Sequence, residues 1–142
     1  MYDTVALLKE TNAGCKSATN AIERILPYIK SRDLKDMVEE YNTRHAKIGA
    51  TCTERLHGMG ESEKDPHPVS GALSQMGIVM SASFRPKETH LADLLAEGCS
   101  MGMRSISRYL NQYPGADPTV RDLAGELIGL EDDFMHDLLP YL

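Results

Sequence analysis

The chain has 142 residues, of which 42% are hydrophobic and 25% are charged, a composition that fits one globular domain and excludes a disordered chain. The formal net charge is −6, and aspartates interrupt the densest basic stretch, around Lys30, Arg32 and Lys35, so we expect neither nucleic acid nor an anionic membrane as a partner. No stretch approaches the roughly 20 apolar residues of a membrane span.

The first half of the chain carries two helical patterns. Apolar or small residues recur at alternating steps of three and four from Asp3 to about Ile29, and again from about Asp33 to Met59. Asp3 and Asp33 are the expected N-caps, and Gly58 with Gly60 ends the second pattern. Only a few residues separate the two helices, so we predict an antiparallel hairpin. The second pattern consists of Leu34, Val38, Tyr41, His45, Ile48, Cys52, Leu56 and Met59.

The middle of the chain is predicted to be a long connection. Residues 60–68 have a loop composition, and Val69–Phe84 shows a short helical pattern, although its run GIVMSASF is also compatible with an extended segment. A short helix with extended flanks is long enough to cross the bundle and to start the third bundle helix parallel to the second.

Two more helices are predicted after the connection. The first begins at Thr89, as its N-cap, and ends near Tyr113, where Tyr-Pro-Gly forms a turn. The last begins at Asp117-Pro118, an N-cap followed by proline, and ends near Leu139. We therefore predict an all-α four-helix bundle with one crossover, forming a single domain over residues 1–142. A simple up-down arrangement of five helices is the alternative.

The chain resembles the ferritin-like superfamily, and within it a group of bacterial bundle proteins without an assigned function. The resemblance rests on LLKETNAGC, LKDMVEEYNTRH, LLAEGCSMG and GLEDDFMH, one segment for each predicted bundle helix. It implies a four-helix bundle of ferritin-like topology, with a short helical crossover between the second and third bundle helices. It also implies a di-iron centre built from inward Glu residues on two helices and Glu-x-x-His on the other two.

The residues match that pattern only in part. The fourth helix has Asp133-x-x-His136, whereas the second has Asn42-x-x-His45, with an amide in place of the carboxylate. Carboxylates on the other helices are Glu97 on the third and either Glu10 or Glu23 on the first.

Helical geometry weakens the match further, because a helix turns by about 100° per residue and each side-chain direction can be derived from the apolar face. Glu10 and His136 are expected on the outer side, and Cys99 is expected to be partly exposed. Glu23 and Glu131 are expected at the edge of the apolar face. An intact di-iron site is therefore not expected.

His45 is the exception, since it lies within the apolar face of its helix and is expected beside Cys15 and Thr19. One interpretation is a buried, hydrogen-bonded histidine that sets the helix register. The other is a metal ligand or proton carrier. In that case the metal ligands would be His45, Glu23 and Glu131, with iron or manganese as the metal.

The remaining signals favour a non-enzymatic role. The three cysteines form no Cys-x-x-Cys pair and the N-terminus lacks a signal-like segment, so we expect a cytoplasmic protein with reduced thiols. No catalytic triad or activated nucleophile can be assigned. We expect a self-associating or binding protein, with a homodimer favoured and the ligand unknown. A metal-binding redox or storage protein is the alternative.

Overall fold

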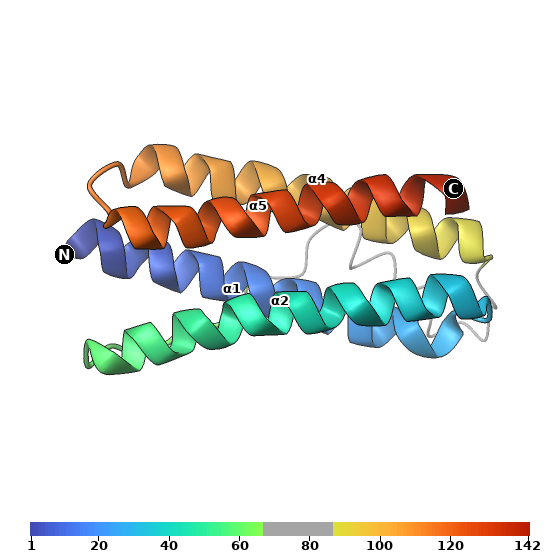
Figure 1. Cartoon of the computed structure of the whole chain (residues 1–142), viewed down its shortest axis with the longest axis horizontal. Helices are drawn as coiled ribbons and strands as arrows, with labels where there is room; N and C mark the ends of the chain where they lie inside the picture. The colour runs from blue at the N-terminus through green and yellow to red at the C-terminus, as the bar shows by residue number, and fades with distance from the viewer. Residues whose placement is uncertain (67–86) are drawn as a thin grey trace.

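The computed structural model describes residues 1–66 and 87–142, and it confirms the predicted all-α four-helix bundle (Figure 1). Within these ranges there is no strand, and none of the helices has the length and apolar content needed to span a bilayer. The elements are α1 (Tyr2–Ile25), η1 (Leu26–Tyr28), α2 (Arg32–Gly58), α4 (Glu88–Gln112), α5 (Pro118–Leu138) and η2 (Leu139–Tyr141).

The bundle consists of two antiparallel hairpins, α1 with α2 and α4 with α5 (Figure 1). α2 ends and α4 begins at opposite ends of the bundle, so these two helices run in the same direction, as predicted. The start of α4 is tied to the turn before α2, because Glu88 Oε1 accepts hydrogen bonds from the backbone amides of Lys30 and Ser31 at 2.8 and 2.7 Å. The predicted crossover helix over Val69–Phe84, and the five-helix alternative that depends on it, lie outside the described residues.

The helix N-termini differ from three of the four predicted caps. The cap of α2 is Ser31, whose Oγ accepts from the Leu34 amide at 3.4 Å, while Asp33 lies in the first turn. Asp3 likewise lies within the first turn of α1. Aspartate suits both positions, because the positive end of the helix dipole stabilises a carboxylate throughout the first turn.

α4 begins at Glu88, so Thr89 is not its cap. The prediction for α5 is confirmed, with Asp117 at the N-cap and Pro118 at the first helical position. At the other end of α2, the predicted stop is also confirmed: Gly60 has a φ of 73°, a left-handed conformation that favours glycine.

The same tripeptide, Leu-Pro-Tyr, forms the single 3₁₀ turn that follows α1 and the one that follows α5. In both turns the proline stands at the first or second position of the new helix. Because proline has no amide hydrogen, it cannot donate the next hydrogen bond of the α-helix. The chain therefore forms one tighter 3₁₀ turn at this point. Pro27 therefore terminates α1 and does not kink it.

The described part of the connection, residues 61–66, is bound to the first hairpin. Glu63 Oε1 accepts hydrogen bonds from Asn12 and Thr53, each at 2.9 Å, and lies 3.0 Å from Lys16 Nζ. Lys64 donates to Glu10, which is 7% exposed. The prediction that Glu10 points outward is therefore wrong, because the connection covers that side of α1 and supplies a cation.

We expect the docking of Glu63 to make the fold sensitive to acid. Hydrogen bonds from Asn12, Lys16 and Thr53 lower the pKa of Glu63 from 4.5 to about 2. A lowered carboxyl pKa stabilises the fold above the pKa of the unfolded chain, and this contribution is lost as the pH falls from 4.5 towards 2. Glu63→Gln should therefore unfold more easily than wild type at neutral pH, with the difference shrinking over that window.

The measurement is urea unfolding as a function of pH for both proteins. Glu61→Gln is the matched control, since Glu61 lies in the same segment but makes only a 3.5 Å, partly exposed ion pair with Lys9. An equal acid dependence in wild type and Glu63→Gln would show that Glu63 does not hold the segment.

A second prediction concerns the start of α4. Glu88→Ala removes two charge-assisted hydrogen bonds to the backbone and should lower the free energy of unfolding by about 1–2 kcal/mol. Thr89→Ala, at the neighbouring exposed position, should change it by only a few tenths of that amount. Chemical denaturation of both variants tests this difference. Similar losses of unfolding free energy in the two variants would show that Glu88 is no more important than Thr89 at the start of α4.

Candidate functional site

His45 lies at the centre of the bundle with 0% of its surface exposed. Its Nδ1 is 2.7 Å from the backbone carbonyl oxygen of Tyr41, and its Nε2 contacts Oε1 of Glu131 on α5. Because a carbonyl oxygen only accepts, Nδ1 must carry a proton and donate it. The tautomer of His45 is thereby determined by its own helix, and Nε2 is left to face Glu131.

Glu131 is buried, with 6% exposure, and its carboxylate is enclosed by α4. A Cβ atom at Gly102 would lie 2.9 Å from Glu131 Oε2, so the glycine leaves the space that the carboxylate occupies. The Cys99 thiol donates a hydrogen bond to the same carboxylate, and burial, followed by the charge of Glu131, raises the pKa of Cys99. Glu131 thus has partners on both α2 and α4.

The contact between Nε2 and Oε1 requires a proton between these two atoms, because two unprotonated acceptors would repel each other. The two states are an imidazolium beside a carboxylate, and a neutral imidazole beside a carboxylic acid. The pair is neutral overall in both states, which removes most of the cost of burying an isolated charge.

Other polar contacts join α2 to α5 on either side of this pair. Tyr41 donates to Asp137, and its ring stacks on Phe134 with centroids 4.4 Å apart. Burial, followed by the hydrogen bond to Asp137, raises the pKa of Tyr41. Nearer the other end of the seam, Arg55 Nη1 donates to Thr119 Oγ1 at 2.9 Å. We call this line of contacts, from Tyr41–Asp137 to Arg55–Thr119, the α2–α5 seam.

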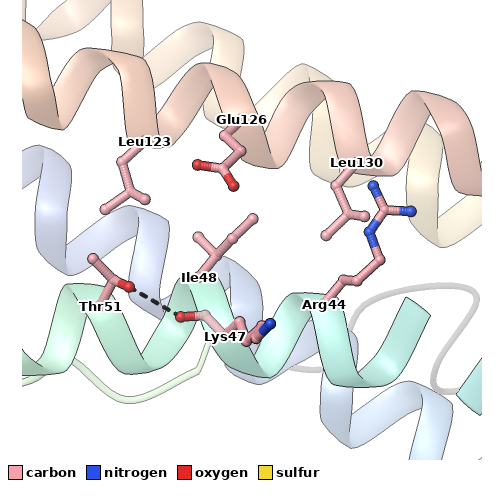
Figure 2. Close-up of a pocket in the computed structure, with 7 residues that line it drawn as sticks. All are labelled: Arg44, Lys47, Ile48, Thr51, Leu123, Glu126 and Leu130. Atoms are coloured by element: carbon pink, nitrogen blue, oxygen red, sulfur yellow. Dashed lines mark hydrogen bonds between the residues drawn. The ribbon is translucent and has the colours of Figure 1, made fainter. Parts of the chain in front are cut away.

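A groove of about 310 Å³ opens in the middle of the seam (Figure 2). Its apolar residues are Ile48 from α2 and Leu123 and Leu130 from α5. Its polar residues are Arg44, Lys47 and Thr51 from α2 and Glu126 from α5. Arg44 and Leu130 are the sequence neighbours of His45 and Glu131, so one end of the groove adjoins the buried pair.

The groove exists because α2 and α5 pack less closely than the helices of either hairpin. Polar residues occupy the positions that would otherwise close the seam: Lys47 and Thr51 on α2, and Glu126 on α5. Lys47 and Glu126 stay exposed to water, whereas the apolar residues beneath them are buried and form the base of the groove.

The structure brings together two of the three residues predicted as metal ligands. His45 and Glu131 are in direct contact, whereas Glu23 is exposed on α1 and does not join them. Glu131 and Cys99 are also more deeply buried than predicted, with exposures of 6% and 2%. The helical-wheel estimate failed for both because a bundle helix that packs against two neighbours buries a wider arc than its apolar face alone.

The residues do not fit the di-iron centre of the ferritin-like pattern. Glu97, Asp133 and His136 are exposed, as the wheel predicted for His136, and the buried Glu10 is paired with Lys64. Across residues 1–66 and 87–142, no three His, Cys, Asp or Glu side chains are grouped so that they could hold a metal ion. Binding of iron or manganese by His45 and Glu131 remains a prediction.

The three cysteines are free and buried, and burial is the main cause that raises the pKa of each thiol, to about 12 for Cys52. Such thiols remain protonated at neutral pH, so they are poor nucleophiles. Cys15 packs near Gly49, since a Cβ at that glycine would lie 3.2 Å from Cys15 Cβ.

Sequence reasoning missed the groove and its charged residues. Lys47 and Glu126 each look like ordinary surface positions beside the apolar face of a helix. They face each other across one groove only because α2 packs against α5. The sequence pattern of a single helix does not indicate which other helix it packs against.

No protein-family model matches the sequence, and a comparison with curated proteins finds no match.

A double-mutant cycle tests the buried pair. His45→Leu leaves Glu131 buried without its partner and should cost roughly 3–5 kcal/mol of unfolding free energy, with a similar loss for Glu131→Leu. The double variant should lose much less than the sum of the two, because it buries no unpaired polar group. Additive losses in chemical denaturation would show that the two side chains do not interact.

Wild type and His45→Leu also test the alternative that His45 and Glu131 bind a metal ion. Elemental analysis of untagged wild type should find stoichiometric iron or manganese that is absent from His45→Leu if the pair binds metal. Wild type without metal, together with a strong coupling energy, would leave the pair with a purely structural role.

Proposed function

We propose that this protein is a non-enzymatic binding protein that holds a small molecule in the groove of the α2–α5 seam. The observation that carries the proposal is the groove itself. Its base is formed by three apolar side chains and its walls by four polar or charged ones, so the groove offers a ligand more polar than apolar surface. Its volume of about 310 Å³ lies at the lower end of the range for such sites.

The polar contacts of the seam support this proposal because they hold the groove open without a ligand. His45–Glu131 and Arg44–Asp133 bridge the helices at one end, and Arg55–Thr119 bridges them nearer the other. A site held in shape by its own scaffold loses little conformational entropy on binding.

The chemistry around the groove favours binding over catalysis. His45, the nearest buried base, has both ring nitrogens engaged and no exposed surface, so it does not reach a molecule in the groove. The buried thiols are protonated at neutral pH, as their raised pKa values indicate.

Three expectations from the sequence remain predictions beside this proposal. They are the self-association as a homodimer, the cytoplasmic location, and the membership of the ferritin-like superfamily. The metal-dependent redox or storage alternative rests on the His45–Glu131 contact alone, since Glu23 is exposed elsewhere on α1. Binding in the groove requires none of these.

A groove-filling variant tests the proposal. Thr51 lies on the rim and its hydroxyl donates to the Lys47 carbonyl at 3.2 Å, so Thr51→Trp should fill the groove and leave the core intact. Thr43→Trp is the matched control, because Thr43 is exposed two turns earlier on α2 and donates to the Glu39 carbonyl at the same distance.

The measurement is ligand-observed NMR with four probes: octanoate, octylamine, leucyl-leucine and octanol. We expect at least one probe to bind wild type and Thr43→Trp, and to bind Thr51→Trp at least tenfold more weakly. If no probe binds, or if Thr51→Trp binds as well as wild type, the groove is not a ligand site.

A further inference from the structure

The groove contains two opposite charges that do not pair with each other. Lys47 comes from α2 and Glu126 from α5, on the two walls of the groove (Figure 2). In the part of the chain that the structure describes, neither side chain makes an ion pair or a side-chain hydrogen bond. Arg44, the other cation of the groove, is engaged by Asp133 at 4.0 Å and by the Tyr41 ring at 5.1 Å.

Apolar side chains at the base of the groove lie between these charges. Ile48, Leu123 and Leu130 line the groove, and Ile48 and Leu130 are only 5% and 4% exposed. A ligand that lies in the groove over these side chains also takes water away from Lys47 and Glu126. Each charge then needs a partner of opposite sign, because an unpaired charge that loses water is costly.

We propose that the groove binds a zwitterion with an apolar body, of the class of apolar dipeptides, with its carboxylate at Lys47 and its ammonium at Glu126. This inference rests on the proposed function and names its ligand class. A simple anion would pair with Lys47 but leave the charge of Glu126 unpaired. A simple cation would pair with Glu126 but would be repelled by Lys47 and Arg44. A neutral amphiphile would leave the charges of both Lys47 and Glu126 unpaired. The volume of about 310 Å³ suits a ligand of dipeptide size.

Blocked dipeptides test the ligand class. Leucyl-leucine, its N-acetyl form without the ammonium, and its amide without the carboxylate share one apolar body and differ in charge. Titration calorimetry at neutral pH should show that leucyl-leucine binds at least tenfold more tightly than either blocked form.

Charge variants test the two contacts. Lys47→Met and Glu126→Gln should each weaken leucyl-leucine binding about tenfold, which corresponds to about 1.4 kcal/mol. Lys35→Met and Glu97→Gln, at exposed positions outside the groove, should leave the affinity unchanged. The double variant Lys47→Glu/Glu126→Lys should regain binding, because a zwitterion can turn end to end and meet the exchanged charges.

The outcomes separate this inference from the proposed function. If the blocked and free dipeptides bind equally well, and Thr51→Trp abolishes both, then the groove is a ligand site but the zwitterion is wrong. If the charge exchange fails to restore binding in a folded double variant, the assignment of the two contacts is wrong. If neither the dipeptides nor the four probes bind, both proposals fail.

Discussion

The buried contact between His45 and Glu131 is the polar constraint that sets how α2 meets α5 across the two hairpins. Each hairpin is held together by apolar packing along its own helices, and α1 also packs against α4 and α5, whereas the smaller contact between α2 and α5 includes several polar side chains. Apolar surfaces can slide by a turn at modest cost, but a histidine whose Nδ1 is already bound to its own helix needs its partner at one position. Gly102 reinforces that requirement, because a larger residue there would displace the carboxylate.

The groove follows from the same constraint. Bridging α2 and α5 at the His45–Glu131 pair and again at Arg55–Thr119 sets the helix separation, and the residues between the bridges are too polar to close it. A bundle that used leucine at Lys47 and Glu126 would fill the seam and have no site. The charges that keep the groove open are therefore the charges that would recognise a ligand.

The candidate site was predictable from the sequence in part, and the errors have physical causes. His45 was found because a histidine inside an apolar helical face stands out, and Glu131 because it lies at the edge of one. Glu23 met the same criterion as Glu131, yet α5 packs between two neighbours at Glu131 while α1 leaves Glu23 in solvent. Glu10 was misplaced because its partner, Lys64, comes from the connection and not from a helix.

The sequence by itself determined the helices, their order and the two hairpins, because helical periodicity, capping residues and proline act over a few residues along the chain. It also determined that the chain is long enough between α2 and α4 for these helices to run in the same direction. Only the tertiary structure decided which polar residues meet. The contacts His45–Glu131, Tyr41–Asp137 and the facing walls at Lys47 and Glu126 join residues more than 75 positions apart. Contacts of that range depend on the rotation and register of α2 against α5, which no pattern within one helix specifies.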